Sequence, residues 1–475
     1  MRPLLHLLQT ALNDRDELES ISAGFVDDAS RLNRTQVAEV RSISGSHDNL
    51  EEQLRAYLEH ARARKLPLSI AGTRHTMGGQ TFTPGGIILD MLGLHEMELD
   101  EQMTVLRVQA GARWSNVLSY VHERGCSIKV MQSNNSFSVG GSLSANCHGW
   151  QPMSSPISST VVAFRLLLAD GTIVRCSREG HAELFSLALG GYGLFGVLID
   201  TELSVTENER YRLTHRVVPS AEYPAFYEEK IKRDAHIGLA YGRLNVEPDH
   251  FLREILLSTY SVIPNRSLSP LGKPDLAGIR RLVFRGSVGS AYGKALRWDL
   301  EKRFGQIPLG SGITRNHLLN EGVEVFQNRS AASTDILQEY FVPTIRLEPF
   351  LEQVRTIILA HRADLLNVTI RFIAPDQESF LRYADQEMFA LVMLFNQPRT
   401  QQADQQMAYM TRELIEAALA LGGRYYLPYR LHAAVEQFYR AYPQAQQFFQ
   451  LKRKYDPEEL FQNELYRKYG AVSGV

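Results

Sequence analysis

The chain has 475 residues and a formal net charge of −2, with 44% hydrophobic and 22% charged residues. This composition is typical of an ordinary globular protein, and the length predicts two or three domains rather than a single core. Lysines and arginines form no long run, which argues against a dedicated nucleic-acid or polybasic membrane surface. No apolar stretch approaches the ~20 residues of a membrane span.

The cysteine content and the N-terminus indicate a cytoplasmic location. Three cysteines are present, and their spacing fits neither a zinc site nor a disulfide framework, which favours a reducing compartment: Cys126, Cys147 and Cys176. The first apolar run is short and is followed by acidic residues, unlike a secretory leader. We therefore predict a short amphipathic helix over residues 4–18, within an N-terminal helical extension of residues 1–34.

The first part of the chain predicts strands and helices that do not alternate regularly. Strands are expected over residues 37–43, 66–70, 86–91 and 104–111. An amphipathic helix starts at Asn49, and another spans 114–124 before Gly125. Such an order predicts an α+β domain with mixed strand pairing.

Glycine-rich runs continue to about residue 199 and then become rare. Two of them span residues 138–150 and 183–199, with a strand pair around Ala169-Asp-Gly between them. Because longer alternating segments follow, we expect a domain boundary near residue 207. The chain ends in a helical pattern over 435–454 and in Asp456-Pro, which would suit the start of a helix.

The most informative segment is residues 67–82, in which a short apolar strand leads into Ala71-Gly72 and a glycine-bracketed turn. Glycines let backbone N–H groups converge on an anion such as a pyrophosphate, because no Cβ blocks the approach. Arg74 and His75 lie within this turn. His75 would then lie beside the molecule that carries the pyrophosphate. The alternative is a loop histidine that is hydrogen-bonded to a neighbouring carbonyl.

Residues 191–196, Gly-Tyr-Gly-Leu-Phe-Gly, match the dinucleotide pattern G-x-G-x-x-G. That pattern requires a strand before it and a helix after it. Here a helical segment, 182–189, precedes the glycines and a strand-like segment follows them, so a Rossmann fold is rejected. The sequence contains no H-E-x-x-H, G-K-[ST] or G-x-S-x-G motif and no EF-hand loop, so we assign no metal ligands.

These runs together resemble the vanillyl-alcohol-oxidase family, whose members carry an FAD-binding domain of the PCMH type. The loop at 71–80, Ser-Val-Gly-Gly…Cys-His-Gly at 138–149, Ala169-Asp-Gly, the 190–197 run and the final Asp456-Pro…Phe461 segment follow the family order. Within this family, the chain resembles the alditol and aldonolactone oxidase and decaprenylphosphoryl-ribose 2-oxidase branches.

The resemblance implies an α+β fold with three successive parts. A two-lobed PCMH-type FAD-binding domain would span residues 35–206. An α+β substrate-binding (cap) domain with an antiparallel sheet would span 207–430. The C-terminal segment, 431–475, would pack back on the FAD domain.

The resemblance also implies the cofactor and its contacts. FAD would be bonded covalently through its 8α-carbon to His75, because many relatives carry this bond at the histidine of a G-x-R-H-[ST] segment; a neutral imidazole is a competent nucleophile near pH 7. The expected FAD-binding residues are Ala71, Gly72, Thr73, Arg74, His75, Thr76, Gly78, Gly79, Gln80, Gly111, Val139, Gly140, Gly141, Ser144, Cys147, His148, Gly149, Gly191, Gly193, Gly196, Val197, Ile199 and Asn463.

Two of these expected contacts keep a structural alternative. His148 resembles a histidine that lies against the flavin ring in related branches, but it could equally hold a turn through its ring nitrogens. Cys147 is more simply read as a small packed residue than as a nucleophile, since no histidine–acid partner is identifiable for it.

On the substrate side, Glu339-Tyr-Phe-Val-Pro and Val368–Ile373 resemble two family strands. Arg371 keeps the family arginine, but Thr369 stands where relatives have a glutamate, which puts a polyol or aldonolactone substrate in doubt. The family lysine position falls on Tyr429. Arg430 next to it could place a positive charge near the reduced flavin, or could form a surface salt bridge. The catalytic candidates are His148, Arg371, Tyr429 and Arg430.

The expected activity is that of an FAD-dependent oxidase or dehydrogenase acting on CH–OH groups. A hydroxyl-bearing small molecule (a sugar, a polyol or a related alcohol) would pass a hydride to flavin N5, and O₂ or another acceptor would reoxidise the flavin. One alternative is the oxidase component of a lipid-linked sugar epimerase with non-covalent FAD, as in the decaprenylphosphoryl-ribose branch. The other is a flavin-free binding protein that retains the fold.

Overall fold

The computed structural model describes residues 24–43, 47–264, 270–271, 281, 283–304, 312–322 and 327–471. The helix expected over residues 4–18 lies outside them. The described chain begins with strand β1 (Phe25–Val26), which pairs antiparallel with β2 (Thr35–Gln36). The expectation that the extension is helical throughout is therefore wrong for residues 25–26, because their backbone groups pair with a neighbouring strand.

A small parallel sheet comes first, in the order β3 (Glu39–Ser42), β5 (Ile87–Asp90), β4 (Leu68–Ala71). Helix α2 (His47–Arg64) connects β3 to β4, because parallel strands need a crossover connection. Its apolar stripe, which includes Leu50, Leu54 and Leu58, is buried against this sheet.

A second, antiparallel sheet follows in the order β10-β9-β11-β7-β6, with β8 also paired to β11. Its strands are β6 (Met97–Leu99), β7 (Val105–Gln109), β8 (Cys126–Ile128), β9 (Val161–Leu167), β10 (Ile173–Ser177) and β11 (Val197–Glu207). The helices between them are α3 (Trp114–His122), α4 (Val139–Ser144) and α5 (Ala182–Ala188). The predicted β9–β10 hairpin is confirmed, and one parallel and one antiparallel sheet give the mixed pairing expected of an α+β fold.

The third sheet is antiparallel and has the order β15-β12-β14-β13-β17-β18-β16-β19. Its strands are β12 (Arg210–Pro219), β13 (Ile237–Leu244), β14 (Glu254–Ile263), β15 (Ile313–Thr314), β16 (Ser333–Pro343), β17 (Asp364–Ile373), β18 (Met388–Pro398) and β19 (Arg424–Tyr425). The change of sheet between β11 and β12 lies beside the predicted boundary at residue 207. The domain division itself stays a prediction.

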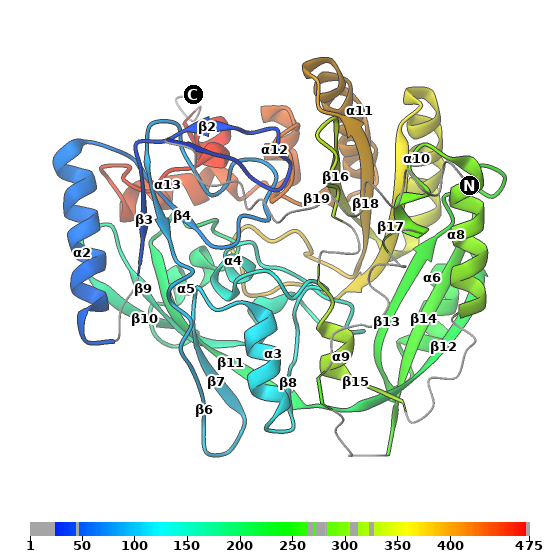
Figure 1. The fold of residues 1–475 in the computed structure, drawn as a ribbon, viewed down its shortest axis with the longest axis horizontal. Helices are drawn as coiled ribbons and strands as arrows, with labels where there is room; N and C mark the ends of the chain where they lie inside the picture. Colours follow the sequence, from blue (N-terminus) through cyan, green and yellow to red (C-terminus); the bar gives the residue numbers. More distant parts are fainter. Residues whose placement is uncertain are drawn as a thin grey trace.

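Helices cover one face of this third sheet (Figure 1). They are α6 (Tyr223–Phe226), α10 (Leu347–His361) and α11 (Gln401–Ala420). On the other face, Arg243 of β13 forms an ion pair with Glu301 of α8 (Ala291–Phe304), 2.7 Å, while α9 (Arg315–Leu319) contacts β8 of the second sheet. Helix α11 touches β16 and β18, and Gln338 of β16 donates a hydrogen bond to Thr411 of α11. Because strand side chains alternate, Glu339 next to Gln338 points to the face opposite α11.

The C-terminal part returns to the first sheet. Helices α12 (Val435–Ala441) and α13 (Ala445–Tyr455) replace the single helix predicted over 435–454, because Pro443 follows Tyr442 between them. Leu68 of β4 forms a parallel bridge with Phe461, and its backbone N–H donates to the Leu460 carbonyl at 2.7 Å.

The helix expected to start at Asp456-Pro is wrong, and residues 457–458 form a turn. Asp456 and Lys452 are both buried, and the Asp456 carboxylate accepts hydrogen bonds from the Lys452 ammonium, 2.7 Å, and from the backbone N–H groups of Leu460 and Phe461. This carboxylate therefore closes a turn rather than capping a helix.

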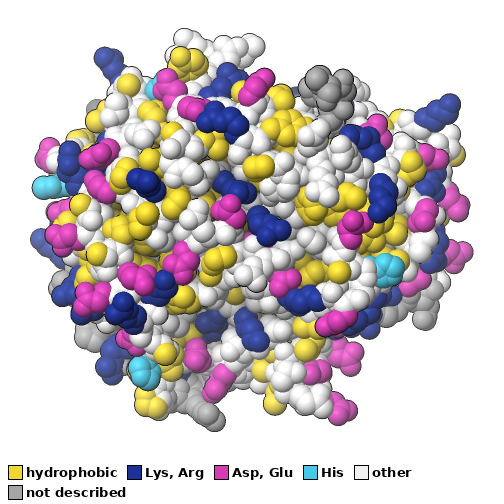
Figure 2. Space-filling model, turned by 180° about the vertical axis from the view of Figure 1, so that it is seen from behind, with side chains coloured by type: hydrophobic (Ala, Val, Ile, Leu, Met, Phe, Trp, Pro, Cys, Tyr) yellow, Lys and Arg dark blue, Asp and Glu magenta, His cyan; other side chains and the backbone are white. Residues whose placement is uncertain are grey.

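Charges of both signs are interspersed over the face drawn in Figure 2. Within the described residues, no helix has the length and apolar character that crossing a bilayer requires. The same residues contain no group of three or more His, Cys, Asp or Glu side chains placed to hold a metal ion.

Candidate cofactor and active site

An open channel runs between the turn after β4, the start of α4 and the loop before β11, and its free space, open solvent included, is about 590 Å³. Its lining comprises Ile70, Gly72, Thr76, Gln80, Thr81, Met91, Ala110, Ser138, Gly140, Gly141, Ser144, Ala145, Tyr192, Gly193, Gly196 and Leu198.

Glycines let the walls of this channel approach one another. A Cβ on Gly72 would lie 2.0 Å from the Ser138 hydroxyl oxygen, so only glycine lets the β4 turn meet α4 this closely. A Cβ on Gly141 would meet nothing but that same hydroxyl, at 2.9 Å. Gly141 is therefore open on its channel side.

The channel also offers polar groups that have no partner within the described protein. The hydroxyl oxygens of Thr76 and Thr81 are buried, and neither has a hydrogen-bond partner among the described residues. Buried polar groups normally are hydrogen-bonded, so these two suit a polar ligand such as a pyrophosphate or ribityl chain. The residues present therefore fit FAD.

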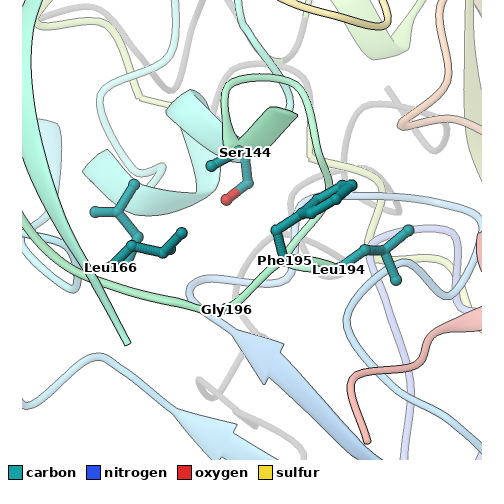
Figure 3. A pocket seen from close by; sticks show the side chains of 8 residues that line it. Ser144, Leu166, Leu194, Phe195 and Gly196 are labelled. Carbon is teal, nitrogen blue, oxygen red and sulfur yellow. The ribbon is translucent and has the colours of Figure 1, made fainter. Parts of the chain in front are cut away.

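A second, smaller hollow continues from the channel and shares Ser144, Gly193, Gly196 and Leu198 with it. Figure 3 shows Ser144 on its helix, with Leu166 beside it and Phe195 on the loop that leads to Gly196. This loop is preceded by α5 and followed by β11, as the sequence predicts, so the rejection of a Rossmann arrangement is confirmed.

His75 lies on the turn after β4, held between an aromatic ring and a hydroxyl. Its ring stacks on Phe137 with 4.3 Å between centroids, and its Nε2 lies 3.2 Å from the Ser136 hydroxyl oxygen. Burial lowers the pKa of His75 from 6.5 to about 4, only partly offset by the Ser136 backbone. The imidazole is therefore neutral at physiological pH.

Eight of the predicted FAD contacts line the channel, namely Gly72, Thr76, Gln80, Gly140, Gly141, Ser144, Gly193 and Gly196. Others support its walls: Gly111 packs against the Met91 carbonyl, and Asn463 donates to the Tyr192 carbonyl at 2.9 Å. Val197 and Ile199 lie in the core of β11. Contact of any of them with FAD stays a prediction.

Sequence reasoning did not select several lining residues. The polar ones, Thr81 and Ser138, stand directly beside the glycine runs, and that proximity was the available signal. The apolar ones, such as Met91 and Leu198, carry no signal that distinguishes them from core residues.

Two predicted catalytic residues, His148 and Tyr429, meet at a third that the sequence reasoning left without a role, Glu339 of β16. His148 Nε2 lies 2.5 Å from one Glu339 carboxylate oxygen, and the Tyr429 hydroxyl donates to the other at 3.1 Å. His148 and Glu339 are 4% and 3% exposed. A carboxylate buried this deeply needs such partners. The single Glu within an otherwise buried strand was therefore the available sign in the sequence that Glu339 belongs to the site.

Aromatic rings enclose this cluster. Phe341, Tyr383 and Tyr426 all have ring centroids within 6 Å of that of His148. Burial, together with the Glu339 charge, raises the pKa of Tyr429 well above its usual value, so Tyr429 remains a neutral phenol. Burial also raises the pKa of Cys147 to about 11, which keeps this residue a thiol.

The two predicted arginines lie apart from each other. Arg371 of β17 donates to the Ser133 hydroxyl at 2.9 Å. Arg430 forms an ion pair with Asp404 of α11, 2.6 Å, and hydrogen-bonds to Asn33. The structure thus brings His148 and Tyr429 together and binds Arg430 to other elements; the catalytic roles stay predictions.

Comparison with known proteins first defines the class. Residues 49–177 match the family described as FAD binding domain. This range contains the turn with His75 and the α4 wall of the channel. The chain is thus similar to FAD-binding domains over this range, and its resemblance to PCMH-type FAD oxidoreductases is confirmed.

Individual relatives extend this comparison. The chain is 28% identical over 221 residues to an uncharacterized oxidoreductase of the fasciation locus of Rhodococcoides fascians, covering 44% of this chain and 48% of that relative. It is 31% identical over 144 residues to cytokinin dehydrogenase 2 of Arabidopsis thaliana, 30% of this chain and 29% of the relative. The match to decaprenylphosphoryl-beta-D-ribose oxidase of Mycolicibacterium smegmatis is 21% over 428 residues, 84% and 88%. The chain thus spans less than half the length of the first two.

Proposed function

We propose that this protein is an FAD-dependent oxidoreductase that oxidises a CH–OH group of a small molecule such as a sugar, a polyol or a related alcohol. The observation that carries the proposal is the buried His148–Glu339–Tyr429 cluster. This cluster lies next to the glycine-lined channel, since Ala145 of the channel wall is only three residues before His148. The names of the relatives cover different substrates, so the choice of a hydroxyl rests on the chemistry of this cluster.

When bound, FAD supplies the hydride acceptor. The protein supplies the route for the hydroxyl proton. Tyr429 is only half-buried and donates its own proton to Glu339, which leaves its oxygen able to accept a proton from a substrate hydroxyl. Glu339 then receives the Tyr429 proton, while His148 holds the other carboxylate oxygen.

The proposed bond between His75 and FAD rests on the resemblance of the Gly-Thr-Arg-His-Thr segment to the family, and the neutral state of the imidazole is compatible with it. Joining the imidazole nitrogen to the 8α-carbon would release one N–H and one C–H proton together with two electrons. O₂ or another external acceptor would take those electrons. A pKa near 4 keeps the ring nucleophilic over the whole neutral range.

The direct test is to denature purified protein in acid and to look for flavin fluorescence in the band on a denaturing gel. Fluorescent wild-type protein, a dark His75→Ala variant and a fluorescent His95→Ala variant would support the proposal; His95 is an exposed histidine on another loop. Yellow protein that loses its flavin on denaturation would refute the covalent bond alone. Protein that binds no flavin in any form and cannot be reloaded would refute the function.

A second candidate is the oxidase component of a lipid-linked sugar epimerase, with non-covalent FAD. The observation that favours it is the match to decaprenylphosphoryl-beta-D-ribose oxidase, which extends over 84% of this chain. Flavin released on denaturation, together with flavin reduction by a prenyl-phosphate sugar and not by free sugars, would favour this candidate. The cytoplasmic location stays a prediction.

A further inference from the structure

Arg371 and Glu339 point to the same side of the third sheet. In the antiparallel register, Thr369 lies opposite Val392, and Val392 lies opposite Glu339. Arg371 lies two residues along β17 from Thr369, on the same face. The other face carries Val368 and Ile370, which are fully buried in the core. Arg371 therefore belongs to the face that holds the proposed active site.

Arg371 has no acidic partner among the described residues. Within the described residues its one hydrogen bond goes to the neutral Ser133 hydroxyl, and its Nε atom is buried there without a partner. The next arginine on this face, Arg243, is neutralised by Glu301 at 2.7 Å. Glu339 instead contacts His148 and Tyr429. Arg371 thus forms no direct ion pair within the described residues, and its guanidinium keeps an unused donor beside the site.

A second unpartnered group lies near the segment that receives Arg371. Gln151 is 5% exposed, yet neither its side-chain nitrogen nor its side-chain oxygen has a partner in the described structure. A Cβ on Gly149 would lie 2.0 Å from this oxygen and 2.3 Å from the Met131 carbonyl. The amide therefore lies between the turn after His148 and the residues just before Ser133.

The spacing between Arg371 and Glu339 suits a small substrate. Two strand spacings and two residues along a strand separate the β-carbons of Arg371 and Glu339 by about 12 Å. The long arginine side chain closes part of this gap. Both charges act on Tyr429, since Glu339 raises the pKa of its hydroxyl and Arg371 lowers it.

We propose that the substrate carries an oxyanion, a carboxylate or a phosphate, that binds Arg371 while its hydroxyl binds at Tyr429. This inference rests on the proposed function. A guanidinium binds planar oxyanions through two parallel N–H donors, and Nε is one of those donors. The substrate class would then be a sugar acid or a sugar phosphate rather than a neutral polyol.

The test compares three probes that share one carbon chain: sorbitol, gluconate and sorbitol 6-phosphate. Binding to the purified holoprotein is measured by titration calorimetry, which does not depend on flavin reduction. We expect at least one anion to bind at least tenfold more tightly than sorbitol, and the better of the two identifies the oxyanion as carboxylate or phosphate. If neither anion binds more tightly than sorbitol, the proposal is overturned.

Variants locate the effect. Arg371→Gln should abolish the preference for the anion. Thr369→Glu should abolish it as well, because it places a carboxylate beside Arg371, whereas the isosteric neutral control Thr369→Gln should retain it. A preference that survives Arg371→Gln would overturn the proposal. The flavin content of each variant is measured on the same samples, so a flavin-free protein refutes the proposed function separately.

Discussion

The burial of His75 predicts an unusual pH dependence for its covalent attachment to FAD. Phe137 covers one face of the imidazole at 4.3 Å, and burial is the main cause of the lowered pKa. Phe137→Ala should admit water to this face and return the pKa of His75 toward its ordinary value. The imidazole Nε2 should keep its hydrogen bond to the Ser136 hydroxyl.

The size of the effect follows from the two pKa values. With a pKa of about 4, His75 is about 97% neutral at pH 5.5, whereas a histidine with the ordinary value of 6.5 is about 9% neutral there. At pH 7.5 both are almost entirely neutral. The wild-type rate of attachment should therefore change by less than about twofold between these pH values, and the Phe137→Ala rate should fall by up to about tenfold.

The assay starts from protein produced under riboflavin limitation. FAD is added at a series of pH values, and the covalent flavin is followed by fluorescence of the denatured band against time. Ser119→Ala, an exposed change on α3, serves as the control and should behave as the wild type does. A wild-type rate that already falls tenfold around pH 6.5 would refute the argument that burial keeps the imidazole neutral.

Three further predictions concern the channel, the buried cluster and a buried lysine. Gly141→Ala should leave the apoprotein as stable or slightly more stable, since the only close neighbour is a movable hydroxyl, but should weaken FAD binding at least tenfold; unchanged flavin content would contradict the channel assignment. Glu339→Gln should keep FAD and slow its reduction by substrate about 10²-fold in stopped-flow measurements; an unchanged rate of reduction would refute the proton route. Burial and two neighbouring arginines lower the pKa of Lys468 from 10.5 to about 8, so the unfolded chain binds more protons between these values and stability rises with pH there. Lys468→Met removes this cost of burying a charge but also removes the hydrogen bond to the Leu431 carbonyl. The net result should be a free energy of unfolding that is higher by roughly 1–2 kcal/mol at pH 7, measured by urea titration, and this gain should shrink above pH 8.

Much of the cofactor half was predictable from the sequence because its determinants are local. The turn that holds His75 follows a short strand and begins at Gly72. Only glycine can approach Ser138 as closely as Gly72 does, so this residue marks the turn in the sequence. The reversed order of helix, glycines and strand around residues 191–196 likewise excluded a Rossmann arrangement before any coordinates were considered. The helix expected at Asp456-Pro failed because a buried lysine and two backbone N–H groups capture the Asp456 carboxylate.

The sequence by itself thus determined the strand–turn order and the glycines around the channel, since both are encoded within short segments. Only the tertiary structure brought Glu339 to His148, which lies 191 positions away, and left Arg371 without an acidic partner among the described residues. Both outcomes depend on the register between antiparallel strands and on which face of the sheet meets the channel. No local pattern carries that information, because a shift of one residue would turn every side chain of the strand to the other face.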